Sequence, residues 1–351
     1  MKLLLTGLLF LLSGLMFSQN VNIPDANFKN YLLTNTAVNT NNDSEIQLSE
    51  ATTFTGTLAF QFWFVSDLTG IEAFTNLTIL DCGDNNLTSL DLSQNVALQQ
   101  LYCYDNQLMS LDLSANENLF ALDCRDNQIT SLDVSDNSLL SYLNCPFNGM
   151  TNLNVSNTAM QTLRCYSNAI TTLNLTNTNS SLSTLLVYNN NISDIDLSDF
   201  SALTIFECGN SSVLTNLNIA NSNNTNITTF NSLNTPNLEC IQVDDEIYST
   251  ANWTNIDPST VFSENCELLN TITSNNLAVT IYPNPTTNFL NINSLEPMAF
   301  NLISLKGQKI KTGTLFKGNN TVDVSRLSMG IYIIQGKTTT GKSISFRFVK
   351  K

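Results

Sequence analysis

The sequence contains no histidine and few charged residues, and both absences limit the chemistry that it can perform. Without histidine there is no Ser-His-Asp or Cys-His pair for nucleophilic catalysis, and the commonest general base and metal ligand is missing. Only 12% of the 351 residues are charged, about half of the usual share, and Asn, Thr and Ser take their place. Neither a Walker-type glycine loop nor a dinucleotide-binding fingerprint occurs. We therefore expect a protein that is not an enzyme.

Basic residues are scarce in the body of the chain. Residues 19–276 hold 27 acidic and three basic residues, a net charge of −24, whereas residues 277–351 hold two acidic and ten basic residues, a net charge of +8. Such a sharp change marks a domain boundary near residue 276. The acidic body argues against nucleic acid as a partner, because phosphates need Lys and Arg. Solubility alone explains the acidic charge equally well.

The N-terminus predicts a signal peptide over residues 1–18. Lys2 supplies the positive end, Leu3–Met16 the apolar core, and Ser18 the small residue before cleavage. The apolar run is shorter than the roughly 20 residues that a membrane-spanning helix needs, and no other stretch is long enough. We therefore expect an exported mature chain without a transmembrane helix.

The middle of the chain repeats itself about every 21 residues. The segment LTILDCGDNNLTSLDLSQNVA from Leu77 returns as LQQLYCYDNQLMSLDLSANEN from Leu98 and as LFALDCRDNQITSLDVSDNSL from Leu119, and weaker copies follow. We call the sixth residue of each copy the anchor position. Its seven members are Cys82, Cys103, Cys124, Cys145, Cys165, Val187 and Cys208, at spacings of 20 to 22 residues.

The pattern L-x-x-L-x-C-x-x-N-x-L resembles the leucine-rich repeat family over about residues 58–243, and the family implies a right-handed solenoid with one parallel strand per turn. The residues indicate the same fold unaided. Leu80 and Cys82 are two residues apart and point to one side of a strand, and one short unit cannot bury them without stacked neighbours. We predict a mainly β fold with about seven to nine repeats over residues 58–243, an N-terminal cap over 19–57, and a C-terminal cap and linker over 244–276.

The anchor cysteines favour a ladder of buried thiols, because the position also accepts Val187 and free cysteine behaves as a small apolar residue. Cys240 and Cys266 differ, since they flank Trp253 after the repeats. We predict a disulfide between them that holds the C-terminal cap over the last turn, with two separate buried thiols as the alternative.

An asparagine follows the anchor position by three residues in six repeats. We expect these side chains to satisfy backbone groups where the strand bends away, and a looser turn where Ser211 replaces Asn. The six are Asn85, Asn106, Asn127, Asn148, Asn168 and Asn190.

Residues 39–50 resemble the calcium-binding loop of an EF-hand, with oxygen-bearing side chains at loop positions 1, 3 and 5 and Glu at position 12. Asn39 replaces the usual Asp and Ser44 the usual Gly, so calcium binding would be weak, about millimolar. A metal-free cap that shields the first repeat is the alternative, and no other cofactor is expected. The candidate ligands are Asn39, Asn41, Asp43, Glu45 and Glu50.

Residues 277–351 predict seven short strands, at 278–282, 288–293, 299–304, 308–314, 319–324, 330–335 and 343–349, and hence a small immunoglobulin-like β-sandwich. Three motifs occur in order: Ile281-Tyr282-Pro283-Asn284-Pro285, Met329-Gly330-Ile331-Tyr332 and a C-terminal Phe346-Arg347-Phe348-Val349-Lys350-Lys351. They resemble the type A C-terminal sorting domain of the type IX secretion system of Bacteroidetes-type bacteria. The resemblance implies that the type IX machinery is a partner and that the chain crosses the outer membrane and is released or anchored at the surface. A structural β-domain that stays attached is the alternative. The residues that carry the sorting motif are Tyr282, Pro283, Asn284, Pro285, Gly330, Tyr332, Lys350 and Lys351.

Two sets of residues recur at fixed positions in the repeats and should point outward from the solenoid. One carries Asp91, Asp112, Asp133 and Asp196, with Asn in other repeats, and a solvated face explains it better than the paired carboxylates of a glycosidase. The other flanks the anchor position and carries Tyr and Arg, the residues most enriched at binding hot spots. We predict that this register is a contact surface about 20 Å long, although Tyr also favours strands for structural reasons. Its members are Tyr102, Tyr104, Arg125, Arg164, Tyr166 and Tyr188.

Three functions remain open: an exported protein that binds a protein or glycan through the strand face, a structural surface component without a specific ligand, and a degradative enzyme of the kind that this secretion route often carries. We favour the first.

Overall fold

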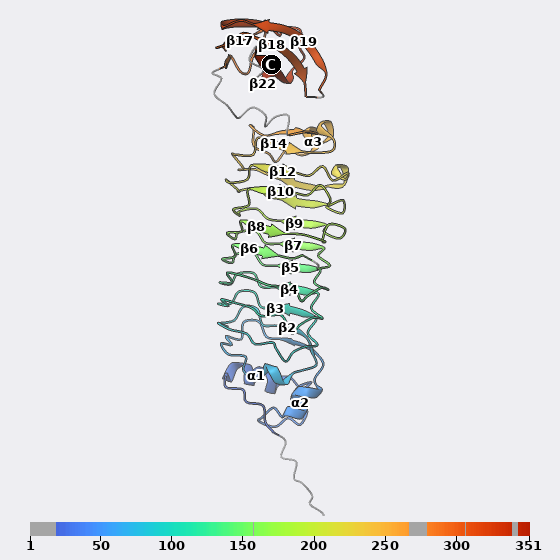
Figure 1. The fold of residues 1–351 in the computed structure, drawn as a ribbon. Coiled ribbons are helices and arrows are strands. Elements are labelled where there is room, and N and C mark those ends of the chain that lie inside the picture. Colours follow the sequence, from blue (N-terminus) through green and yellow to red (C-terminus); the bar gives the residue numbers. More distant parts are fainter. Residues whose placement is uncertain (1–18, 157, 267–278, 306, 339–342) are drawn as a thin grey trace, which may run out of the picture. The chain divides into compact units, whose positions relative to one another are not determined.

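The computed structural model describes residues 19–351 except 157, 267–278, 306 and 339–342 (Figure 1). The chain divides into two compact units. Unit 1 runs to Ile192 and adds Ala202–Ser211 and Ile227–Leu233, and unit 2 holds Ser193–Ser201, Ser212–Asn226 and Asn234–Lys351.

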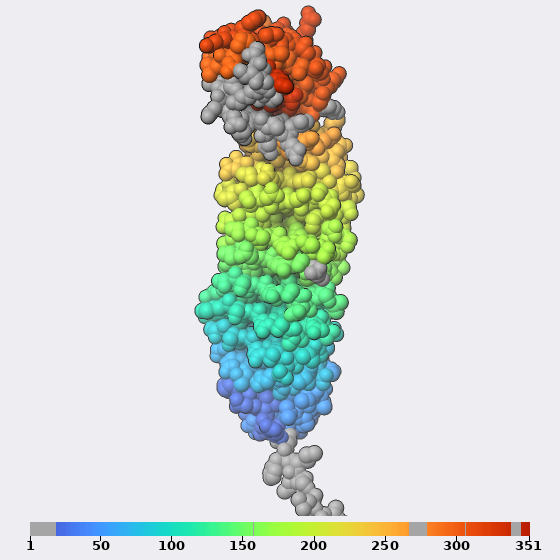
Figure 2. Space-filling view, viewed as in Figure 1, coloured from blue at the N-terminus to red at the C-terminus, as the bar shows by residue number. Residues whose placement is uncertain are grey.

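Unit 1 is built around a nine-stranded parallel sheet in which each strand comes from the next turn of the chain. The leucine before the anchor position sets the register, so Leu80 pairs with Leu101 and Leu101 with Leu122. These leucines and the anchor cysteines are fully buried, which confirms the predicted mainly β solenoid. In Figure 2 the turns follow one another as bands from blue to green. The strands, in sheet order, are β1 (Gly56–Ala59), β2 (Leu77–Asp81), β3 (Gln100–Tyr102), β4 (Ala121–Asp123), β5 (Tyr142–Asn144), β7 (Thr162–Arg164), β9 (Thr184–Leu186), β11 (Ile205–Glu207) and β13 (Thr229–Asn231).

A second set of short strands closes the turns. Two of them, β6 (Asn152–Asn154) and β8 (Thr172–Asn174), pair within unit 1. In unit 2 four strands form a parallel sheet, and α3 (Glu246–Asn252) and the 3-10 turn η2 (Asn224–Asn226) lie in its connections. The strands of this sheet are β10 (Asp194–Asp196), β12 (Asn216–Asn218), β14 (Cys240–Gln242) and β15 (Val261–Ser263).

The solenoid has about ten turns, slightly more than the seven to nine repeats predicted. The irregular last turn accounts for part of the difference. After Cys208 the next residue in the buried register of the nine-stranded sheet is Ser232, because Phe206 pairs with Phe230. Cys240 belongs instead to β14, which pairs with β12 in the other sheet.

The asparagines three residues after the anchor close each turn as expected. The Nδ2 of Asn127 donates to the carbonyls of Cys103, Cys124 and Arg125 at 3.0, 3.2 and 3.1 Å, and its Oδ1 accepts from the amide of Leu108 at 2.9 Å. Each side chain thus joins two neighbouring turns. At the position of Ser211 the side chain donates only to the carbonyl of Gly209, at 3.4 Å.

A second buried asparagine ladder, on the other side of the turn, was not predicted. The Nδ2 of Asn116 donates to the carbonyls of Leu92 and Asn95 at 3.2 and 2.9 Å, and Asn137 repeats the arrangement one turn later. The signal was present in the sequence, because these asparagines also recur every 21 residues. Thr158 and Thr178 take over in the next two repeats, which hides the pattern. The three members are Asn95, Asn116 and Asn137.

The N-terminal cap consists of two short helices, α1 (Ala26–Thr34) and α2 (Leu48–Thr53), followed by the 3-10 turn η1 (Ile71–Ala73). Asp25 starts α1, since its side chain accepts from the amides of Asn27 and Phe28. Phe28 and Leu32 on one face of α1 are fully buried, and the ring of Phe28 lies 5.4 Å from that of Phe60. The cap therefore covers the apolar edge of the first turn.

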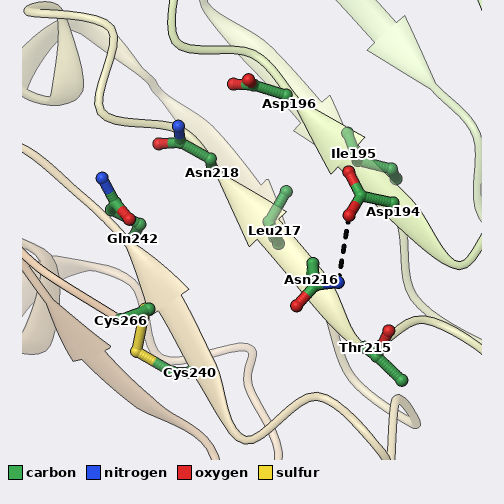
Figure 3. A pocket seen from close by; sticks show the side chains of 10 residues that line it. All are labelled: Asp194, Ile195, Asp196, Thr215, Asn216, Leu217, Asn218, Cys240, Gln242 and Cys266. Carbon is green, nitrogen blue, oxygen red and sulfur yellow. Dashed lines mark hydrogen bonds between the residues drawn. A yellow bond between two sulfur atoms is a disulfide. The ribbon is translucent and has the colours of Figure 1, made fainter. Parts of the chain in front are cut away.

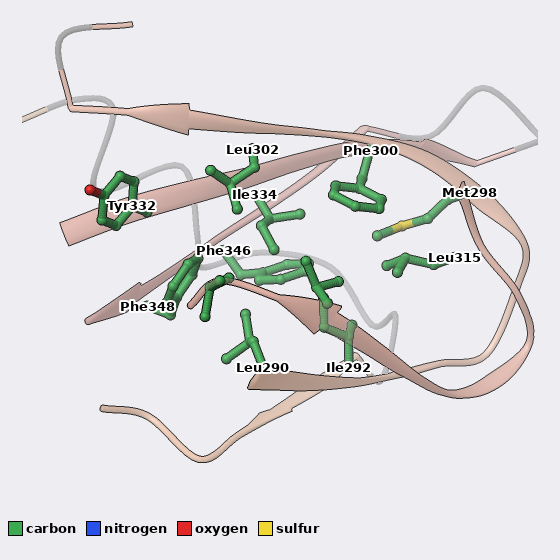
Figure 4. Packing of buried hydrophobic residues seen from close by; sticks show 12 residues of the cluster. Leu290, Ile292, Met298, Phe300, Leu302, Leu315, Tyr332, Ile334, Phe346 and Phe348 are labelled. Atoms are coloured by element: carbon green, nitrogen blue, oxygen red, sulfur yellow. The ribbon is translucent and has the colours of Figure 1, made fainter. Parts of the chain in front are cut away.

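The C-terminal domain is a sandwich of two antiparallel sheets and confirms the predicted β-sandwich. One sheet has the order β16-β17-β20 and the other β19-β18-β21-β22. Figure 4 shows Phe300, Ile334 and Phe346 from one sheet packing on Leu290 and Ile292 from the other. All seven strands were predicted, within a few residues at their ends. They are β16 (Thr280–Tyr282), β17 (Phe289–Ser294), β18 (Met298–Ser304), β19 (Lys309–Leu315), β20 (Gly318–Asp323), β21 (Gly330–Thr338) and β22 (Ser343–Lys350).

Candidate functional site

The outward side of the nine-stranded sheet brings the six tyrosines and arginines into two clusters, which we call together the Tyr/Arg face (Tyr102, Tyr104, Arg125, Arg164, Tyr166 and Tyr188). The first cluster lies on β3 and β4 and just after them. The guanidinium carbon of Arg125 lies 4.2 Å from the ring centroid of Tyr104, a cation–π contact. On its other side the Tyr104 ring covers Gly83, where an added Cβ would meet ring atoms at 2.4 Å. Both faces of this ring are therefore occupied within the protein.

Asp123 neutralises the arginine of the first cluster. It forms an ion pair with Arg125 and accepts a hydrogen bond from Asn144 at 2.9 Å. Burial raises the pKa of the Asp123 carboxyl, and these two partners oppose the shift. Arg125 is thus a structural cation on this surface.

The second cluster is more open to a ligand. The rings of Tyr166 and Tyr188 are stacked with centroids 4.3 Å apart, and Phe147 meets Tyr166 edge-on at 5.5 Å. Phe147 is 50% exposed. Arg164, at the end of β7, takes part in no ion pair among the described residues, and its buried Nε–H donates to no partner there. An aromatic platform beside an unneutralised guanidinium is the arrangement here that is best suited to recognition.

Burial raises the pKa of Tyr188 to about 12, and the neighbouring Tyr166 adds to the shift. The hydroxyl therefore stays protonated at every physiological pH, and it forms a hydrogen bond with Tyr166. Phe147 was missed because it lies in the turn after the anchor, where the other early repeats carry Asp. Tyr142 was missed because it precedes the anchor by three residues, one step outside the register that was considered.

In the candidate calcium loop the predicted ligands lie close together, but their oxygens already accept hydrogen bonds or form an ion pair within the protein. Both oxygens of Glu50 accept backbone hydrogen bonds, from Thr40 at 2.8 Å and from Gln47 at 3.0 Å. Glu45 pairs with Lys29 at 2.8 Å.

The remaining candidate ligands of this loop bond to one another or are buried. Asn41 donates to Asp43 at 2.9 Å, and the Nδ2 of buried Asn39 donates to the carbonyl of Asp43 at 3.0 Å. Across the described part of the chain, no three His, Cys, Asp or Glu side chains are placed to hold a metal ion. This geometry is that of a loop closed by hydrogen bonds.

The outward carboxylates of the second register bind their own turns. Asp112 accepts from the amide and the hydroxyl of Ser114 at 3.0 and 2.8 Å, and Asp91 and Asp133 accept from Ser93 and Ser135. These hydrogen bonds lower the pKa of all three carboxyls. A glycosidase needs one carboxyl with a raised pKa to act as general acid, so this register lacks that feature.

Unit 2 carries a polar groove that the sequence analysis did not identify (Figure 3). The outward residues of β10, β12 and β14 line it in two rows, with Asp196, Asn218 and Gln242 in one row. Asn216 donates to Asp194 at 3.0 Å in the other row. At one side lies a disulfide between Cys240 and Cys266, which ties the residue before the undescribed segment to β14.

The six other cysteines are free and fully buried. Burial raises the pKa of the Cys165 thiol to about 12 and shifts the others in the same direction. They therefore form the buried thiol ladder that the sequence predicted, without nucleophilic character.

The three sorting motifs meet around the last strand of the C-terminal domain. Gly330 pairs with Lys350 and Tyr332 with Phe348 across β21 and β22. The Oδ1 of Asn284 accepts from the amide of Val349 at 2.8 Å, which fixes the opening Tyr282–Pro285 segment beside β22. Tyr282 is half exposed, Lys350 is buried and Lys351 is exposed. Motifs that are up to 65 residues apart in sequence thus form one structural unit.

Residues 280–351 match the family of secretion system C-terminal sorting domains, which confirms the type of domain that the motifs indicated. The chain thus joins a solenoid of parallel strands to a C-terminal sorting domain, and this domain implies export to the outer membrane or cell surface. No helix in the described ranges is long and apolar enough to cross a membrane. A search of curated proteins finds no significant match.

Several solved leucine-rich-repeat structures are similar to this chain. InlJ of Listeria monocytogenes, whose functional domain includes a cysteine ladder, is 22% identical with a TM-score of 0.38, covering 95% of this chain and 98% of that one. Internalin C2 of the same organism is 22% identical with a TM-score of 0.46, covering 64% and 96%. The leucine-rich repeat domain of APL1B is 17% identical with a TM-score of 0.40, covering 54% and 57%. Likeness at this level carries no inference about function.

Proposed function

We propose that this exported leucine-rich-repeat protein binds a protein or glycan partner through the Tyr/Arg face, and that it is not an enzyme. The observation that carries the proposal is the second cluster, in which the stacked Tyr166 and Tyr188 and the edge-on Phe147 lie near Arg164, which has no ion-pair partner among the described residues. Stacked aromatic rings offer a large rigid contact area, and a free guanidinium adds a directional donor for a carboxylate or hydroxyl. The sorting domain delivers this surface to the outside of the cell.

The first cluster contributes to the shape of the proposed contact surface more than to its binding energy. Because the ring of Tyr104 lies between Gly83 and Arg125, it holds the strand face flat and contributes mainly its hydroxyl edge to a partner. We therefore expect Tyr102, Tyr104 and Arg125 to form the rim of the contact, and Arg164, Tyr166 and Tyr188 its energetic centre.

The proposal is tested by screening the full chain against glycan and host-protein arrays, alongside two variants. In the first, Arg164, Tyr166 and Tyr188 are changed to Ala. In the control, Phe120→Ala, a partly exposed aromatic residue is removed just before β4. We expect the parent and the control to bind the same partner, and the triple variant, still folded by circular dichroism, to lose at least tenfold in affinity.

Two results would overturn the proposal. If the parent binds nothing on the arrays, the structural-component function moves ahead. If the triple variant binds as well as the parent, the ligand uses another surface, for which the polar groove of unit 2 is the first place to look.

A further inference from the structure

Two phenylalanines of unit 1 occupy backbone conformations that bulky residues avoid. Phe62 and Phe147 have φ of 62° and 53°, in the left-handed region, and both lie two residues after the anchor position of their turn. Asp or Asn fills this position in most turns, as in Asp105 and Asn189. Short polar side chains tolerate the left-handed region, whereas a large side chain there is strained. Such strain persists where another role requires the residue.

Burial does not offset the backbone strain of either phenylalanine. Phe62 is 69% exposed and Phe147 50% exposed, and Phe64, two residues after Phe62, is 72% exposed with φ of 57°. Because burial does not offset this strain, we take the exposed phenylalanines as candidates for contact with a partner.

The two phenylalanines enclose three carboxylates in one continuous column. The amide of Phe62 donates to the carbonyl of Asp84 at 3.0 Å. In the next two turns the amide that follows Asp84 donates to the carbonyl of Asp105, and the amide that follows Asp105 donates to the carbonyl of Asp126, both at 3.2 Å. The amide of Asn127 then donates to the carbonyl of Phe147 at 3.3 Å. We call this set the left-handed column: Phe62, Asp84, Asp105, Asp126 and Phe147.

The carboxylates of the column repel one another. Burial, and then the neighbouring Asp105, raise the pKa of both Asp84 and Asp126. Arg125 approaches Asp126 at 3.8 Å, but Asp123 already forms an ion pair with it. The column is therefore left with an excess of negative charge between two apolar ends.

We propose that the left-handed column docks an extended peptide segment that carries basic side chains flanked by aromatic ones. The column spans four steps between neighbouring strands, about 19 Å, which an extended segment covers in about seven residues. Alternate side chains of such a segment face the same way, so an order of apolar, basic, basic and apolar side chains at every second residue matches the column. The inference rests on the proposed binding function and names the chemistry of the partner.

The test uses the full chain and a fluorescent peptide, Phe-Ser-Lys-Ser-Lys-Ser-Phe. Two further peptides replace both Lys with Glu or both Phe with Ser. We expect binding only of the first peptide, weakening as salt concentration rises. If the full chain binds the Glu peptide equally well, or binds none of them, the proposal is wrong.

Matched variants separate the column from the general acidity of the chain. One variant changes Asp84, Asp105 and Asp126 to Asn, and its control changes Asp91, Asp112 and Asp133, in the second register of the same three repeats, to Asn. The two variants have the same net charge. We expect the column variant to lose at least tenfold in peptide affinity and the control less than threefold. Equal losses would mean unspecific charge attraction and would overturn the proposal.

A last variant has opposite effects on binding and stability. Replacing Phe62 and Phe147 with Asn, the residue that fills this position in later turns, should weaken peptide binding at least fivefold and raise the melting temperature. If stability falls instead and affinity is unchanged, the phenylalanines are structural. Because Phe147 also contacts Tyr166, the variant Phe62→Asn alone separates the two proposals: it should weaken peptide binding and leave binding of the array partner unchanged.

Discussion

Two rows of asparagine side chains link neighbouring turns of unit 1, and their hydrogen bonds make them costly to replace. Changing Asn127 to Ala removes the acceptor for the amide of Leu108 and one of the two side-chain donors to each of the carbonyls of Cys103 and Cys124. We expect a loss of about 2 kcal/mol in the free energy of unfolding, mainly because the amide of Leu108 loses its partner. Denaturant unfolding measures it.

The matched control is Ser211, which occupies the position of Asn127 in the last but one turn of unit 1. Ser211 makes a single long hydrogen bond there, so Ser211→Ala should cost less than about 1 kcal/mol. Equal losses at the two positions would contradict the assignment of the turn-closing role to asparagine.

The anchor cysteines should accept an apolar residue and reject a polar one. Cys124 is fully buried, and Val187 fills the same position in another turn. We expect Cys124→Val to change stability by less than about 1 kcal/mol and Cys124→Ser to cost about 2 kcal/mol, because a buried hydroxyl lacks a partner. Thermal unfolding of the two variants checks the difference. A Ser variant as stable as the Val variant would show that the position tolerates a hydroxyl.

At the scale of elements, the disulfide holds the last strands of unit 2. Cys240 and Cys266 are 26 residues apart, and the loop that they close contains α3 and β15. Replacing both with Ser should destabilise this segment by about 3 kcal/mol. Limited proteolysis should then cut between β14 and β15 first, while the parent resists. Equal resistance of both proteins would show that packing around Trp253 alone holds the segment.

The column of carboxylates makes a pH-dependent prediction. A carboxyl whose pKa is higher in the folded chain than in the unfolded chain stabilises the fold when protonated, and this stability is lost as the pH rises through the folded pKa. Asp84 and Asp126 are such groups, and Asp105 lies between them. Asp105→Asn should therefore raise stability at pH 7 by about 0.5 kcal/mol and leave it unchanged near pH 3.

Melting temperatures at both pH values test this prediction. The control is Asp112→Asn, because hydrogen bonds from Ser114 lower the pKa of Asp112 and its charged form suits the fold. That variant should show no gain at pH 7. A gain in both variants would mean that any loss of negative charge stabilises the chain, independent of the column.

The elements with strict periodicity could be predicted from the sequence, and those that interrupt it could not. Leu80 and Cys82 fix one face of a strand, and their return every 21 residues fixes the solenoid. The seven strands of the C-terminal domain follow from alternation between turn residues. The second asparagine ladder was missed because threonine replaces asparagine in the following repeats. Phe62 could not be read as part of a column, since its left-handed backbone is visible only in three dimensions.

For the candidate site, too, the sequence predicted the periodic positions but not the contacts between side chains. Alternation correctly put Tyr166 and Tyr188 on one side of the sheet, but their stacking, the contribution of Phe147 and the ion pair that neutralises Arg125 depend on side-chain positions. The resemblance of residues 39–50 to a calcium loop rests on residue types and their spacing. The hydrogen bonds from Thr40 and Gln47 to Glu50 depend on how this loop folds, which a motif does not specify.

At the scale of the whole molecule, the C-terminal domain implies delivery, and we propose that the repeats carry out recognition. Deleting residues 280–351 should leave the chain inside the outer membrane, because the sorting domain is lost while the repeats remain intact. Cell fractionation, with protease treatment of intact cells, measures the location. The triple variant of Arg164, Tyr166 and Tyr188 is the control and should reach the surface normally. Surface delivery of the deleted chain would show that another segment carries the export signal.

The hydrogen bonds of the nine-stranded sheet run from turn to turn, and this direction has a mechanical consequence. A force that pulls the first and last turns of unit 1 apart loads every row of these bonds in series, so that the weakest row yields first. Where Ser211 replaces asparagine, one long side-chain hydrogen bond stands in place of the several that asparagine forms in other turns. Under tension unit 1 should therefore lengthen in steps of one repeat, beginning near that turn, and absorb mechanical work at each step.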